Sequence, residues 1–112
     1  MKSSQPSLSS YRSVVITGAS SGLGEEFAKQ LAPHTGRMLL IARRLDRLES
    51  LKSTLAQSHP DLEVQALRAD LLEQQQRETV LTHIENLGWS LDLWINNAGM
   101  GCLLYTSDAA DD

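Results

Sequence analysis

Residues 13–27 decide the fold of this chain, and they read Ser-Val-Val-Ile-Thr-Gly-Ala-Ser-Ser-Gly-Leu-Gly-Glu-Glu-Phe. The apolar run at residues 14–16 is β-branched throughout, which is typical of a strand buried on both faces. The run stops at Thr17, and a helical pattern begins near Gly22. A strand, a glycine-rich turn and a helix in this order favour a bound pyrophosphate, because the first helical amides lack internal partners and the helix dipole is positive there.

The glycines of this stretch have distinct predicted roles. A side chain at Gly18 or Gly22 would obstruct the turn or the approach of a ligand, and Gly24 would let the helix pack close to the strand. We therefore predict a dinucleotide contact along the whole loop, formed by Gly18, Ala19, Ser20, Ser21, Gly22, Leu23 and Gly24.

Two motifs resemble the short-chain dehydrogenase/reductase family. Residues 17–24 have the form Thr-Gly-x-x-x-Gly-x-Gly, and residues 96–99 read Asn-Asn-Ala-Gly. A glycine-rich loop alone is a weak signal, but two motifs in the family's order, each after a strand-like segment, make a strong one. The resemblance covers residues 13–101 and implies an NAD(P)-dependent oxidoreductase fold.

Strand-like and helix-like segments alternate along the rest of the chain. Apolar runs predict further strands at residues 38–42, 62–67 and 91–96. Helical spacing predicts three helices, the last of them over residues 73–87. The residues expected to face inward are Leu23, Phe27, Ala28 and Leu31 in the first helix and Leu45, Leu48, Leu51 and Leu55 in the second. We therefore expect an α/β fold: the N-terminal half of a Rossmann-type, doubly wound parallel sheet, with spatial strand order 3-2-1-4.

Arg43 and Arg44 follow the second predicted strand directly, with no carboxylate before Asp46. In a dinucleotide fold, an acid at this position selects NAD, whereas an arginine accommodates the 2′-phosphate of NADP. Guanidinium groups pair well with phosphate oxygens. A solvated loop is the alternative, but the Rossmann context favours NADP as the cofactor over NAD.

The resemblance also assigns residues after the third and fourth strands. Asp70 matches the acid that accepts hydrogen bonds from the adenine amine, and the backbone of Leu71 matches the segment along the ring; alternatively, Asp70 starts the next helix. In the family, the first Asn of the second motif ties neighbouring strands together, which gives Asn96 a structural role. The remaining residues of that motif lie by the cofactor, and they are Asn97, Ala98 and Gly99.

Composition limits the class of protein. The 112 residues suit one small domain or part of a larger one, and the net charge of −4 gives no sign of nucleic-acid or anionic-membrane binding. Residues 1–101 contain no cysteine, which suits a reducing compartment, so we expect a cytoplasmic protein. We expect no metal site, and we expect residues 1–12, which are Ser-rich with almost no apolar content, to form a flexible arm.

The family resemblance stops after Gly101. Residues 102–112 resemble the conceptual translation of a transposase adapter used in DNA library preparation, and all eleven residues agree with that frame. We interpret them as a sequencing artefact joined to a truncated reading frame.

The family's catalytic residues have no counterpart in this chain. The resemblance implies a Tyr-x-x-x-Lys acid/base pair beyond the fourth strand, but no lysine follows Lys52, and neither Tyr11 nor Tyr105 is a candidate. We therefore expect an inactive fragment of an NADP-dependent enzyme, homo-oligomeric in its complete form, that acts on a carbonyl or secondary alcohol. The alternative is a non-catalytic NADP(H)-binding module; a different Rossmann protein such as a methyltransferase fits the second motif poorly.

Overall fold

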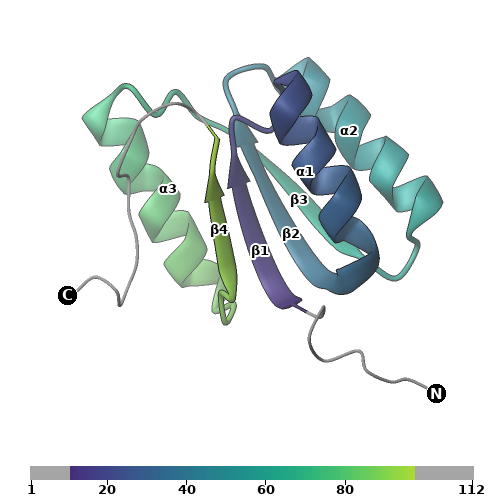
Figure 1. The fold of residues 1–112 in the computed structure, drawn as a ribbon. Coiled ribbons are helices and arrows are strands. Elements are labelled where there is room, and N and C mark those ends of the chain that lie inside the picture. The colour runs from purple at the N-terminus through teal and green to yellow at the C-terminus, as the bar shows by residue number, and fades with distance from the viewer. Residues whose placement is uncertain (1–10, 98–112) are drawn as a thin grey trace.

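A computed structural model describes residues 11–97 of the chain (Figure 1). Residues 1–10 and 98–112, which hold most of the predicted arm and the whole adapter-like tail, lie outside the described residues. Strands and helices alternate in the order β1 (Tyr11–Thr17), α1 (Gly22–Leu31), a short 3₁₀ turn (Ala32–His34), β2 (Thr35–Ala42), α2 (Leu45–Ser58), β3 (Glu63–Arg68), α3 (Gln74–Leu87) and β4 (Leu93–Asn96).

The four strands form one parallel sheet in the order β3-β2-β1-β4, which confirms the predicted topology. The register places Val15 of β1 between Leu39 of β2 and Trp94 of β4. At the ends of the strands, Thr17 lies opposite Ile41 and Asn96. Because all strands run the same way, the loops that leave them meet at one edge of the sheet, the carboxyl edge.

Helices cover both faces of the sheet, as the doubly wound prediction requires. Figure 1 shows α1 and α2 on one face and α3 on the other. Val14 and Ile16 pack with the leucine stripe of α2, whereas Val15 packs with Val80 and Ile84 of α3. Successive residues of β1 thus enter two separate apolar cores, which explains why its sequence is continuously apolar instead of alternating.

Two strands begin earlier than the apolar pattern predicts. β1 starts at Tyr11, inside the predicted arm, because Tyr11 pairs with Thr35 of β2. The backbone N–H of Arg12 also donates to the Asp92 carboxylate at 2.7 Å, and the N–H of Asp92 donates to the Ser13 carbonyl at 3.0 Å. β2 starts at Thr35, three residues before its first buried side chain. Strand pairing therefore extends into polar residues that carry no apolar signal.

Two leucines predicted to face inward are exposed instead. Leu23 is 61% exposed and Leu45 is 45% exposed. In α1 the next residue, Gly24, faces the turn at Gly18, so Leu23 points about 100° away around the helix. Leu45 is the first residue of α2, and the buried stripe begins one turn later, at Leu48.

Among residues 11–97, none of the helices combines the length and the apolar character needed to cross a bilayer.

Candidate nucleotide-binding site

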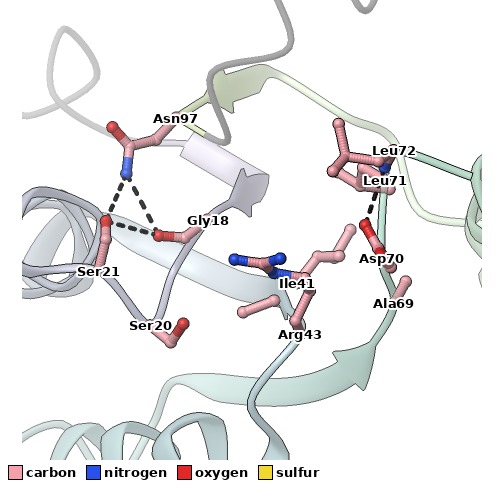
Figure 2. A pocket seen from close by; sticks show the side chains of 11 residues that line it. Gly18, Ser20, Ser21, Ile41, Arg43, Ala69, Asp70, Leu71, Leu72 and Asn97 are labelled. Carbon is pink, nitrogen blue, oxygen red and sulfur yellow. Dashed lines mark hydrogen bonds between the residues drawn. The ribbon is translucent and has the colours of Figure 1, made fainter.

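A cleft of about 290 Å³ lies at the carboxyl edge of the sheet (Figure 2). Its walls come from the β1–α1 turn, the end of β2, the segment after β3 and the residue after β4. The residues that line it are Gly18, Ser20, Ser21, Ile41, Ala42, Arg43, Ala69, Asp70, Leu71, Leu72 and Asn97.

The β1–α1 turn is built around the carbonyl of Gly18. Gly18 has a φ of 65°, a left-handed conformation that favours glycine. Its carbonyl oxygen accepts hydrogen bonds from the backbone N–H of Ser21 at 3.1 Å, the Ser21 hydroxyl at 2.9 Å and the Asn97 side-chain nitrogen at 3.2 Å. The turn is thus fixed by its own sequence and by a residue from the far end of the chain.

Ser21 is the N-cap of α1. Its hydroxyl accepts a hydrogen bond from the backbone N–H of Gly24 at 3.1 Å and another from the Asn97 side-chain nitrogen at 2.8 Å. Together with its donation to Gly18, this uses the hydroxyl's donor and both of its acceptor positions. Ser21 therefore shapes the turn, a role that the sequence pattern alone did not distinguish from the ligand contact predicted for the whole loop.

Gly22 and Gly24 lack a side chain for different reasons. A Cβ built on Gly24 would overlap the Gly18 carbonyl oxygen and lie 2.9 Å from both the Ala19 Cα and the Asn97 side-chain nitrogen. A Cβ on Gly22 would meet no protein atom within 4 Å. The close packing expected at Gly24 is therefore present. At Gly22, nothing in the described part of the protein requires glycine, and the space beside its Cα, next to the first turn of α1, is open.

The two arginines after β2 are placed differently. Arg43 lines the cleft (Figure 2). Arg44 does not line it and instead pairs with Asp46 at 3.4 Å. The hydrogen bond from Arg44 lowers the pKa of the Asp46 carboxyl below its ordinary value. A third cation, Arg47, donates to the Ser20 carbonyl at 3.4 Å. Sequence reasoning did not single out Arg47, because its position within α2 carries no signal of contact with the glycine-rich turn.

Asp70 starts a turn that precedes α3, and it does not cap the helix. The N-cap of α3 is Glu73. One Asp70 carboxylate oxygen, Oδ1, accepts the backbone N–H of Leu72 at 3.0 Å, and the Asp70 carbonyl accepts the N–H of Glu73 at 3.1 Å. The simple helix-start alternative is therefore wrong, and Asp70 lines the cleft.

Thr17 and Asn96 join β1 to β4 beneath the site. The buried Thr17 hydroxyl lies 3.0 Å from the Asn96 side-chain oxygen, which accepts its hydrogen. Asn97, the next residue, directs its side-chain nitrogen toward the β1–α1 turn (Figure 2). Asn96 thus bonds to strand β1, and Asn97 bonds to the β1–α1 turn.

The structure brings together some, but not all, of the residues predicted from sequence. Gly22, Leu23 and Gly24 form the first turn of α1, Ala19 is fully buried, and Ala98 and Gly99 lie outside the described residues. The predicted residues that line the cleft are Gly18, Ser20, Ser21, Arg43, Asp70, Leu71 and Asn97. Sequence reasoning missed Ile41, Ala42, Ala69 and Leu72, although the expected meeting of strand ends at one edge could have identified them.

The cleft has the chemistry that a dinucleotide needs. The first two residues of α1, Gly22 and Leu23, have backbone N–H groups without intrahelical partners, which suits a phosphate. Arg43 supplies a cation, and Asp70, which lies across the cleft from the β1–α1 turn, supplies an acceptor (Figure 2). Over residues 11–97, no three His, Cys, Asp or Glu side chains lie close enough together to hold a metal ion.

A parallel sheet in the order 3-2-1-4, with a glycine-rich turn between its first strand and helix, defines a Rossmann-type nucleotide-binding fold. The family described as short chain dehydrogenase matches residues 12–112, and the chain belongs to this family.

Relatives and solved structures agree with this assignment. The NADPH-dependent reductase BacG of Bacillus subtilis is 34% identical over 88 residues, which are 79% of this chain and 34% of the relative. The crystal structure of the bulky-bulky ketone specific alcohol dehydrogenase from Comamonas testosteroni has a TM-score of 0.70 and 33% identity, covering 81% of this chain and 37% of that one. A short-chain dehydrogenase from Sphingobium yanoikuyae, solved in complex with NADPH, has a TM-score of 0.61 and 34% identity, covering 65% of this chain and 28% of that one.

The chain spans about a third of the length of the curated relatives that it matches.

Proposed function

We propose that this chain binds NADP(H) in the cleft at the carboxyl edge and forms the cofactor-binding part of a short-chain dehydrogenase/reductase. The observation that carries the proposal is the convergence of the glycine-rich turn, Arg43 and Asp70 on one cleft. In this arrangement the pyrophosphate lies at the first turn of α1, where the open space beside Gly22 leaves room for it. Asp70 and Leu71 face the adenine, and Asn97, which lines the cleft, lies by the cofactor ribose.

Arg43 provides the preference for NADP(H) over NAD(H). Its exposed guanidinium lines the cleft just past β2, where a dinucleotide fold places the adenosine ribose. Arg44 contributes less, because it lies outside the cleft and pairs with Asp46. Two relatives support this assignment, the NADPH-dependent reductase of Bacillus subtilis and the Sphingobium yanoikuyae dehydrogenase that was solved with NADPH.

In the complete enzyme, the bound cofactor exchanges a hydride with a carbonyl or secondary alcohol substrate. The similarity to the ketone-specific alcohol dehydrogenase of Comamonas testosteroni supports this substrate class. We further propose that the complete enzyme is a homo-oligomer and that it works in the cytoplasm, because residues 1–101 contain no cysteine.

The chain by itself is proposed to lack hydride-transfer activity, because no lysine follows Lys52 to complete a Tyr-x-x-x-Lys pair. The same observation favours a second candidate, a module that binds NADP(H) without catalysis. Sequencing the gene beyond codon 101 distinguishes them: an in-frame Tyr-x-x-x-Lys supports the enzyme, and an authentic stop codon without that motif supports the module. We interpret residues 102–112 as an artefact, and this interpretation predicts that the gene does not encode them after codon 101.

The cofactor assignment is tested by comparing the affinities of NADPH and NADH for the wild type, Arg43→Asp and, as a matched control, Arg44→Asp. A charge-assisted pair contributes about 1.5–3 kcal/mol, so Arg43→Asp should weaken NADPH roughly tenfold to a hundredfold and leave NADH less affected. Arg44→Asp should have the smaller effect. A wild type that prefers NADH, or an unchanged preference in Arg43→Asp, would show that Arg43 does not hold the 2′-phosphate.

A further inference from the structure

The segment after β3 is held in place by two side chains of α3 that do not line the cleft. The backbone N–H of Asp70 donates to the side-chain oxygen of Gln76 at 2.6 Å. One nitrogen of the Arg77 guanidinium donates to the carbonyl of Leu71 at 2.8 Å. Both bonds are partly buried, and each joins residues that are six positions apart in sequence.

Together with two further hydrogen bonds, these contacts fix the cleft wall from Ala69 to Leu72. The N–H of Ala69 donates to the Ala42 carbonyl at 2.9 Å, which ties the segment to β2. The N–H of Leu72 donates to Asp70 Oδ1, so this carboxylate oxygen is used inside the turn. The other oxygen, Oδ2, takes no part in these bonds, and the orientation of the turn decides where it points.

We propose that Gln76 and Arg77 are positioning residues for adenine recognition: they fix the main chain at Asp70 and Leu71 so that Asp70 presents its second carboxylate oxygen to the amino group of the adenine. This inference rests on the proposed function, because it assumes that the adenine occupies this part of the cleft.

The three successive glutamines of α3 differ in a way that supports this role. Gln74 is exposed and donates to Glu78 on the surface at 3.3 Å, and Gln75 is also exposed. Gln76 is half-buried and reaches the Asp70 amide. A run of identical residues thus contains one member with a structural contact to the cleft wall, and its neighbour Gln75 provides a matched control.

The test compares the affinities of NADPH and its hypoxanthine analogue for the 112-residue chain, measured by NMR titration. The analogue carries a carbonyl oxygen in place of the amino group, so it offers an acceptor to the Asp70 carboxylate where adenine offers a donor. We expect the wild type to prefer NADPH about tenfold, since the preference reflects a hydrogen bond to a charged group. Gln76→Met and Arg77→Met should reduce this preference to within about twofold, because an unanchored turn no longer aims the carboxylate.

The controls separate positioning from general stability. Gln75→Met introduces the same side chain one residue away and should keep the wild-type preference. Arg77→Lys retains a donor and should restore part of the preference lost in Arg77→Met. Hydrogen exchange of the Asp70 amide should accelerate in Gln76→Met and stay unchanged in Gln75→Met.

The two ways in which the inference can fail are told apart with Asp70→Asn. If this variant loses the preference while Gln76→Met and Arg77→Met retain it, the positioning role is overturned and the adenine assignment stands. If the wild type does not distinguish the two ligands, or binds neither, both the adenine assignment and the inference built on it are overturned. An Asp70 amide that exchanges equally fast in the wild type and Gln76→Met also contradicts the inference.

Discussion

The side-chain nitrogen of Asn97 lies 2.8 Å from the hydroxyl of Ser21, although the two residues are 76 positions apart. The same nitrogen lies 3.2 Å from the Gly18 carbonyl, so both of its hydrogens are donated to the β1–α1 turn. Asn97, the residue after β4, therefore holds the β1–α1 turn through these two hydrogen bonds. Consequently, the shape of the glycine-rich turn depends on the pairing of β4 with β1 as well as on its own glycines.

Removing the side chain of Asn97 should destabilise the fold. Asn97→Ala deletes two hydrogen bonds and leaves the Gly18 carbonyl and Ser21 hydroxyl with one partner fewer, so we expect a loss of about 1–2 kcal/mol in the free energy of unfolding. Urea denaturation followed by circular dichroism measures it. Asn86→Ala, on the exposed surface of α3, is the control and should change stability much less. Equal effects of the two substitutions would contradict the role given to Asn97.

The two helical glycines should respond to alanine in opposite ways. Gly24→Ala places a methyl group against the Gly18 carbonyl and should destabilise the fold by about 1–3 kcal/mol. Gly22→Ala meets no protein atom and replaces glycine in a helix, so stability should be unchanged or raised by up to about 1 kcal/mol. Gly22→Ala should nevertheless weaken NADPH binding, because its methyl group occupies space proposed for the pyrophosphate. Thermal unfolding and NADPH titration of both variants check this, and a Gly22→Ala variant with full affinity would place the pyrophosphate elsewhere.

The pKa of Asp46 should depend on its hydrogen bond from Arg44. The hydrogen bond from Arg44 lowers the pKa of Asp46 below its ordinary value of 3.8. A carboxyl with a depressed folded-state pKa stabilises the fold above its unfolded-state pKa, and this contribution disappears as the pH falls through the folded-state value. Both side chains are exposed, so the effect on stability should be small. Arg44→Gln should raise the pKa of Asp46 toward 3.8 in a carbon-detected NMR titration, whereas Arg43→Gln should leave it in place.

The 112-residue chain should not catalyse hydride transfer. It has no lysine after Lys52 and therefore no partner that could lower the pKa of a tyrosine base. An assay of the purified chain with NADPH and a panel of carbonyl compounds should show no turnover, and deleting residues 102–112 should change nothing. Turnover that survives purification and disappears with the deletion would establish residues 102–112 as functional protein.

The order and direction of the strands could be predicted from sequence because each has a physical signature in the chain. Continuous apolar runs mark the strands buried on both faces, and the glycine spacing after residue 17 fixes where the first helix begins. The beginnings of β1 and β2 could not be predicted, since pairing there involves main-chain atoms of residues such as Arg12 and Gly36. Because this pairing uses main-chain atoms of polar residues, no apolar pattern in the sequence marks where these two strands begin.

The cleft was predictable where residues follow strands directly, as at Arg43 and Asp70, because parallel strands bring these positions to one edge. Contacts made by helix side chains were not predictable. Whether Arg47 reaches Ser20, or Gln76 reaches Asp70, depends on the angle at which each helix crosses the sheet. The periodicity of a helix reports which face is apolar and does not fix that angle.

The placement of β4 beside β1 also affects the order in which the chain can fold during synthesis. β1 leaves the ribosome first and can pair with β2 and then β2 with β3 as each emerges, but its other side has no partner until Leu93–Asn96 has been made. Until β4 has been synthesised, β1 therefore remains an apolar strand with one unpaired edge. The step that closes this edge also delivers Asn97 to the turn, so the cleft reaches its final shape only when nearly all of the described chain has been synthesised.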